Sequence, residues 1–194
     1  MEPSEWNLSL PACMARDWRP QIGDPEITGW LTVLVYLATM ALAAAVAWRG
    51  RGTRGNGFWG GIALLMLFLA LNKQLDLQSA LTAFGRCLSH AQGWWEHRRL
   101  VQLGFILLLL AGMVWAMRRV VAQMNHALLR RNRLALAGLG VLCAFVLMRA
   151  VGFHFVDVLI GVRIAGIPMN FIFENIGLIL IAINAFGLLR RAAR

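Results

Sequence analysis

The stretch LVQLGFILLLLAGMVWAM, residues 100–117, decides the fold class of this chain. It contains no charged residue, and it is bracketed by Arg98 and Arg99 before it and by Arg118 and Arg119 after it. A bilayer core about 30 Å thick needs roughly 20 mostly apolar residues per helix. The stretch therefore predicts a transmembrane helix with a pair of cationic residues at each end.

Further segments of the chain have the length and apolar content of a membrane-spanning helix, at residues 28–48, 58–78, 134–155 and 167–189. The composition agrees with them, because 59% of the 194 residues are hydrophobic and 14% are charged, whereas a soluble domain has about 25% charged residues. We therefore expect an all-α fold, a polytopic membrane bundle of five transmembrane helices. It forms one domain over residues 28–194, after a tail at residues 1–27.

The arginines between these segments are divided unequally between the two sides of the membrane. The richer side carries eleven of them: Arg49, Arg51, Arg54, Arg118, Arg119, Arg130, Arg131, Arg133, Arg190, Arg191 and Arg194. The other side carries six: Arg16, Arg19, Arg86, Arg98, Arg99 and Arg163. Short loops rich in Arg and Lys remain cytoplasmic, which predicts an outside N-terminus and a cytoplasmic C-terminus. The same rule explains the net charge of +10 without a nucleic-acid partner.

The connection at residues 79–95 is apolar on one face only. Leu81, Phe84 and Leu88 recur at helical spacing, with Ser79 and Arg86 on other faces. Such a segment is typical of a helix that lies in the membrane interface or folds over a bundle. We expect this interfacial helix on the outer side, with membrane lipids as its partners.

Polar side chains gather near the outer ends of the second, fourth and fifth predicted spans. They are Asn72, Lys73 and Asp76, then Arg149, His154 and Asp157, then Asn170 and Glu174. An ionisable side chain at the centre of a span costs about 2.5 to 3.5 kcal/mol and needs a partner or water. We therefore expect an outward-facing polar pocket, with Arg149 paired to Glu174 and Lys73 paired to Asp76.

The pocket suggests roles for its residues. Asp76, His154 and Asp157 are the candidates for acid or base catalysis, because their side chains can exchange a proton. The candidates for ligand binding are Asn72, Lys73, Arg149, Asn170 and Glu174, in which the two cations would hold an anionic head. The protein would then bind or process a lipid or another amphiphile. Whether it is an enzyme stays open at this point.

Two other functions fit the same residues. The charges can pair the helices of a non-enzymatic structural or assembly subunit, either within the bundle or with a membrane-protein partner. A small transporter subunit is the third possibility. Five helices are few for a carrier, so this reading requires a homo-oligomer. Small residues at helical spacing, Gly57 with Gly61 and Ala41 with Ala45, indicate close helix contacts.

The outer-side histidines His90, His97 and His154 are weak candidates for metal ligands, with carboxylates nearby. Neither of the paired-histidine motifs HExxH and HxxxH occurs, so we predict no metal site. Whether the protein uses a cofactor stays open at this point. Cys13 and Cys87 both fall on the outer side, where an oxidising compartment permits a disulfide between them.

Three strings carry a family resemblance: NKQLDLQ at residues 72–78, GWWEHRR at 93–99 and RAVGFHFVD at 149–157. In these strings the chain resembles a group of small polytopic inner-membrane proteins of proteobacteria. The resemblance implies a multi-pass protein of the bacterial cytoplasmic membrane. It implies no activity, so the roles given above depend on the residues alone.

Overall fold

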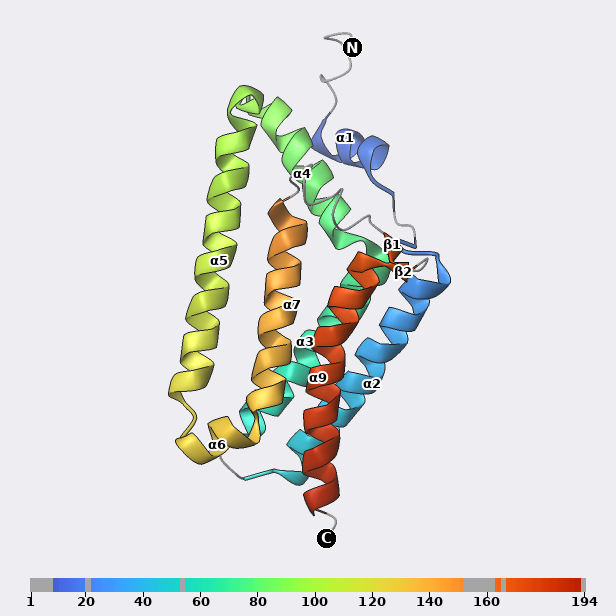
Figure 1. The fold of residues 1–194 in the computed structure, drawn as a ribbon. Helices are drawn as coiled ribbons and strands as arrows, with labels where there is room; N and C mark the ends of the chain where they lie inside the picture. Colours follow the sequence, from blue (N-terminus) through green and yellow to red (C-terminus); the bar gives the residue numbers. More distant parts are fainter. Residues whose placement is uncertain (1–8, 20–21, 53–54, 152–162, 165–166, 193–194) are drawn as a thin grey trace.

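The structure is a computed structural model that describes residues 9–19, 22–52, 55–151, 163–164 and 167–192. The first part of the chain forms α1 (Leu10–Asp17), α2 (Ile27–Arg49), α3 (Asn56–Leu75) and α4 (Leu77–Ala91). The second part forms the 3-10 turn η2 (Trp95–His97), α5 (Arg98–Ala122), α6 (His126–Arg131), α7 (Arg133–Val151) and α9 (Met169–Ala192). Before α9, the two-residue strands β1 (Arg163–Ile164) and β2 (Ile167–Pro168) pair antiparallel. The fold is thus helical apart from this short ladder (Figure 1).

Long apolar helices dominate the fold, as the sequence predicts. Four described helices are long and apolar enough to cross a membrane: α2, α3, α5 together with η2, and α9. The fourth expected span, residues 134–155, overlaps α7 and continues into residues outside the described part. The chain is therefore a helical protein with several membrane-spanning candidates.

The core lies among α2, α3, α7 and α9. α2 packs against both α3 and α9, and α9 packs against α7. Tyr36, Met66, Leu142, Leu178 and Ile181 are the larger side chains of this core, each at most 2% exposed. These four helices therefore form the packed core of the molecule.

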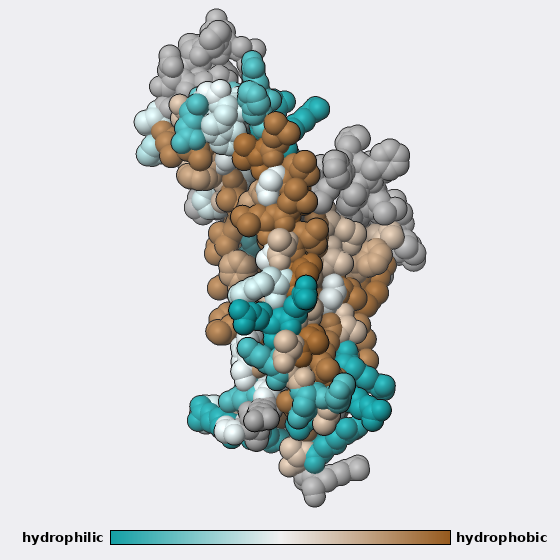
Figure 2. Space-filling view, turned by 90° about the vertical axis from the view of Figure 1, so that its left-hand side faces the viewer, coloured by the Kyte–Doolittle hydropathy of each residue, from teal (hydrophilic) through white to brown (hydrophobic). Residues whose placement is uncertain are grey.

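α5 is placed differently from the other long helices. Its contacts with α7 are few, and within the described part of the chain no side chain of α5 is buried. In Figure 2, which views the α5 side, hydrophobic surface fills much of the middle and hydrophilic residues gather toward the two ends. This pattern is typical of a helix that faces lipid.

The second expected span, residues 58–78, ends earlier than predicted. α3 stops at Leu75, and Asp76 adopts a left-handed conformation with φ of 46° before α4 begins at Leu77. Aspartate tolerates this conformation better than most residues because its short side chain can bond locally. The break turns the polar NKQLDLQ string into a corner, and α4 leads away from the bundle axis toward α5 (Figure 1).

Glycines bring α7 and α9 close together. A Cβ added at Gly138 would lie 2.5 Å from the carbonyl oxygen of Gly177, so no side chain fits there. The close contact expected at Gly57 and Gly61 is wrong, because a Cβ on either would meet nothing within 4 Å among the described residues. The small-residue contact therefore joins α7 and α9, which places the C-terminal part of α7 and the first turns of α9 beside the polar corner.

Asparagines join the helices at the opposite end. Asn184 of α9 accepts from the Ala135 backbone N–H at 2.9 Å and donates to the Arg131 carbonyl at 3.0 Å. Asn132, 2% exposed, accepts from the Trp59 indole at 3.2 Å. Buried amides that satisfy backbone groups fix the axial position of one helix against another.

Candidate functional site

Lys73 is the centre of a buried polar cluster. Its Nζ lies 2.9 Å from Glu174 Oε2 and 3.2 Å from Asp24 Oδ2. The side chains of Lys73 and Glu174 are 11% and 4% exposed, and that of Asp24 is 30% exposed. One ammonium therefore joins the last turn of α3, the first turns of α9 and the segment before α2.

Tyr36 completes this cluster from α2. Its hydroxyl donates to Glu174 Oε1 at 3.0 Å, so each oxygen of the Glu174 carboxylate has a donor. Asn175, the residue after Glu174, donates to Thr32 Oγ1 at 3.2 Å and to the Phe171 carbonyl at 2.8 Å. A buried carboxylate persists only when it is paired and hydrogen-bonded. The Glu174 environment meets that requirement.

The segment before α2 reaches the cluster by docking on the end of α3. The Gly23 backbone N–H donates to the Gln74 carbonyl at 2.8 Å, which satisfies one of the carbonyls that a helix leaves free at its C-terminus. A Cβ at Gly23 would lie 2.8 Å from the Asp76 Cβ, so this approach needs glycine. The docked backbone places Asp24 against Lys73.

Both expected ion pairs are replaced by others. Glu174 pairs with Lys73 rather than Arg149. Arg149 instead donates from Nε to Gln78 Oε1 at 3.3 Å, and Gln78 Nε2 donates to the Arg149 carbonyl at 3.1 Å. Lys73 does not pair with Asp76, because the break after Leu75 removes the helical geometry that the expectation assumed.

A cavity of about 830 Å³ lies beside this cluster, between α3, α4, α5, α7 and the first turns of α9. Its apolar lining includes Phe68, Leu69, Leu81, Phe84, Phe105, Leu109, Phe145 and Val146. Its charged lining consists of Asp24, Lys73, Asp76, Arg86, Arg98, Arg99, Arg149 and Glu174. Ligand pockets of proteins measure about 300 to 1,000 Å³ and combine apolar walls with a few polar groups.

The structure brings most of the expected site residues to this cavity. Asn72, Lys73, Asp76, Arg149 and Glu174 all line it. Asp76 is half-buried, and within the described part of the chain its carboxylate makes no hydrogen bond or ion pair.

The other expected residues lie elsewhere. Asn170, in the first turn of α9, is outside the lining, and its buried Oδ1 has no hydrogen-bond partner among the described residues. His154 and Asp157 lie outside the described residues.

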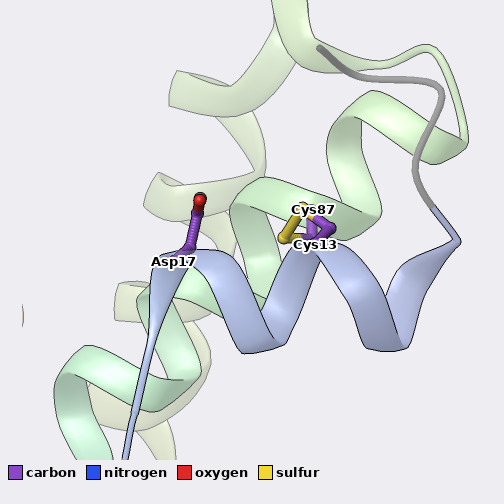
Figure 3. A group of neighbouring side chains, drawn as sticks. All are labelled: Cys13, Asp17 and Cys87. Atoms are coloured by element: carbon purple, nitrogen blue, oxygen red, sulfur yellow. A yellow bond between two sulfur atoms is a disulfide. The ribbon is translucent and has the colours of Figure 1, made fainter.

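The candidate metal ligands do not form a cluster in the described part of the chain. His90 stacks on Trp95 with ring centroids 4.1 Å apart, and His97 is exposed in η2. A different group, Cys13, Asp17 and Cys87, has ligand atoms within 4.8 Å of one another (Figure 3). Its two cysteines form a disulfide, so no thiolate is present to bind a metal.

That disulfide joins α1 to α4 and pairs the two cysteines for which the sequence permits a bond. Arg86 of α4 also approaches Asp17, with 3.8 Å between its NH1 and Oδ2. The pKa of His90, four residues after Arg86 along α4, is lowered from 6.5, first by desolvation and then by the charges of Arg86 and Arg98. Desolvation and the nearby arginines therefore both favour the neutral form of this imidazole.

Sequence reasoning missed Asp24, Tyr36 and the arginines Arg86, Arg98 and Arg99 as members of the site. A signal for Tyr36 exists, since it is the single tyrosine of the chain. It also shares one helix face with Thr32 and Thr39, four residues before it and three after it. No comparable signal exists for Asp24, because its position depends on how the N-terminal segment docks.

Comparison of the chain with protein-family models, with curated proteins and with solved structures finds no match.

Proposed function

We propose that this is a multi-pass protein of the bacterial cytoplasmic membrane, and that its outer-side cavity binds a lipid or another amphiphile. The observation that carries the binding function is the lining of the 830 Å³ cavity, which combines aromatic and aliphatic walls with charged groups. An amphiphile has the same division into an apolar chain and a polar head. Water or a small polar solute would leave the apolar walls unmatched.

In this proposal α7 is the fifth span, the N-terminus lies outside and the C-terminus lies in the cytoplasm. The arginine count supports this orientation, because the connections at the α6 end and the C-terminal residues carry the larger share (Figure 1). The disulfide between Cys13 and Cys87 supports it as well, since α1 and α4 would face an oxidising compartment. A C-terminal reporter that became active outside the cell would contradict the orientation.

Processing of the amphiphile is a further step of the proposal, and Asp76 is its acid or base candidate. Its carboxylate is half-buried, lines the cavity and has no protein partner among the described residues. Lys73 and Glu174 are less suited, because they already bond to each other. The proposed roles of His154 and Asp157 depend on residues outside the described part.

A second function, a structural or assembly subunit, is favoured by the bonding of Lys73. Its ammonium has two carboxylate partners, and this cluster joins α3 to α9 and to the segment before α2 without any ligand. α5 leaves apolar surface free for a membrane-protein partner or a second copy of the chain. In that case the cavity would hold bulk lipid only.

Two neighbouring leucines of α5 separate these functions. Leu109 lines the cavity, whereas Leu108 is 72% exposed on the outer face of the helix. We would purify wild type, Leu109→Trp and Leu108→Trp in a neutral maltoside detergent and identify retained lipid by native mass spectrometry. If the cavity binds an amphiphile, wild type and Leu108→Trp retain a defined lipid and Leu109→Trp loses it at an unchanged melting temperature. Equal lipid retention in all three proteins would contradict the binding function.

A further inference from the structure

We propose that the amphiphile carries an anionic headgroup of the phosphate type, held by an arginine cluster of Arg86, Arg98, Arg99 and Arg149. This inference rests on the proposed function, because it assumes that the cavity takes an amphiphile. It differs from the expectation based on sequence, in which Lys73 shares the binding of the head with Arg149.

The charge balance of the cavity lining supports an anionic headgroup. Among the described residues, the lining has five cations, Lys73 and the arginine cluster, against three carboxylates, Asp24, Asp76 and Glu174. Lys73 is paired with two of these carboxylates. Within the described lining, Asp76 is then the carboxylate that opposes the arginine cluster, so this described part of the cavity has an excess of positive charge.

The present bonds of the arginines are the second argument. Arg149 bonds to the neutral amide of Gln78, and Arg98 donates to the Trp95 carbonyl at 3.2 Å. Arg86 lies 3.8 Å from Asp17, and Arg99 has no hydrogen bond or ion pair within the described part of the chain. A guanidinium carries five N–H donors. Most donors of the cluster are therefore available to a ligand.

The choice of residue is the third argument. The planar guanidinium matches two oxygens of a phosphate at once, whereas an ammonium acts as a point charge. Arg98 and Arg99 begin α5, and Leu109 lies three turns further along the same helix, where Phe145 of α7 also lines the cavity. A molecule with its phosphate at the arginines can thus lay an acyl chain along α5.

The two ends of α5 supply a matched experiment. Arg98 and Arg99 line the cavity, and Arg118 and Arg119 form an equivalent pair near the other end of the helix. Dioctanoyl phosphatidic acid, dioctanoylglycerol and inorganic phosphate are titrated onto the detergent-purified protein and followed by native mass spectrometry. We expect wild type to bind the phosphatidic acid at least about tenfold more tightly than the other two probes.

The double variant Arg98→Gln/Arg99→Gln is expected to lose about tenfold in affinity for phosphatidic acid and to bind dioctanoylglycerol as wild type does. Arg118→Gln/Arg119→Gln should keep wild-type affinity for both. If the first double variant does not fold, Arg86→Gln serves as the alternative. This variant should also lower the affinity for phosphatidic acid.

Other outcomes overturn the inference in distinct ways. Equal affinity of wild type for phosphatidic acid and dioctanoylglycerol would contradict the inference of an anionic headgroup. It would not contradict the proposed binding of an amphiphile. Phosphate that binds as tightly as phosphatidic acid would indicate a soluble anion instead. Equal losses in the two double variants would indicate attraction to the overall charge. Absence of binding by every lipid probe would contradict the proposed function itself.

Discussion

Lys73 Nζ lies 2.9 Å from Glu174 Oε2. This contact joins α3 to α9 through two residues that are 101 positions apart in the sequence. The pair lies at the corner where α3 ends, beside the cavity that we propose as the binding site. Glu174 therefore joins α3 to α9 at the wall of the cavity. The positive charge of Lys73 is already paired with carboxylates in the absence of a ligand.

Lys73→Met should strongly destabilise the protein, because it leaves the Glu174 charge buried with Tyr36 as its remaining partner. Breaking a buried ion pair costs about 3 to 5 kcal/mol. The double variant Lys73→Met/Glu174→Gln should recover most of this loss, because the buried Glu174 charge is removed as well, and the Asp24 carboxylate, which also loses Lys73, is 30% exposed. Thermal unfolding in detergent measures both effects. Arg16→Gln is the control, because it removes the ion pair of Arg16 with Asp17, in which the arginine side chain is exposed. A double variant as unstable as the single one would contradict the prediction.

Tyr36→Phe should cost about 1 to 3 kcal/mol, because it removes the donor to Glu174 Oε1 and leaves that oxygen unsatisfied in a buried site. Thr39→Val is the matched control on the same helix. The Thr39 hydroxyl donates to the carbonyl of Val35 within α2, so its loss should have a smaller effect. Unfolding midpoints of the two variants provide the comparison, and equal values would show that the Tyr36 bond contributes little.

Gly138→Ala should destabilise the contact of α7 with α9 by about 1 to 3 kcal/mol, because its Cβ would lie 2.5 Å from a backbone oxygen that cannot move freely. Gly140→Ala, two residues along α7, would meet nothing within 4 Å among the described residues. The control should therefore stabilise the helix by about 0.4 to 1 kcal/mol. Melting temperatures that move in opposite directions confirm the contact, and a shared direction argues against it.

The stability of α4 and its contacts should fall in acid through His90. Its folded-state pKa lies below 6.5, first because of desolvation and then because of Arg86 and Arg98, with Arg16 acting in the same direction and Asp17 against it. The folded protein thus favours the neutral ring. The contribution of neutral His90 to the free energy of unfolding is fully present above about pH 6.5. It is lost as the pH falls through that value toward the folded-state pKa. His90→Gln should show a smaller drop in melting temperature between about pH 8 and about pH 5 than wild type. Identical drops would exclude His90 as the cause.

The disulfide between Cys13 and Cys87 should hold α1 on α4. Labelling of the denatured protein with a maleimide polymer should add one polymer without reduction, at Cys143, and three after reduction. Cys13→Ser should also lower the stability, by about 4 kcal/mol in the loop-entropy model, because the bond closes a loop of 74 residues. Three labels without prior reduction would contradict the bond.

The sequence by itself determined the fold class. Uncharged runs such as residues 100–117 can bury their backbone polar groups only as helices, so helical spans follow from composition and length. The sequence also indicated the end of the bundle to search, because Lys73, Asp76 and Arg149 fall near the C-terminal ends of two predicted spans and Glu174 near the N-terminal end of the last, and these ends meet in an alternating bundle.

The tertiary structure decided which of these groups meet. Helical spacing relates residues within one helix, but rotation between helices is set by packing, here by the close approach of Gly138 and Gly177. The left-handed residue Asp76 ended α3 early and removed the expected local pair with Lys73. Docking of Gly23 on α3 then supplied Asp24 as a partner. Periodicity carries no information on contacts between segments so distant in the chain, and for that reason the partners of Lys73 required the fold.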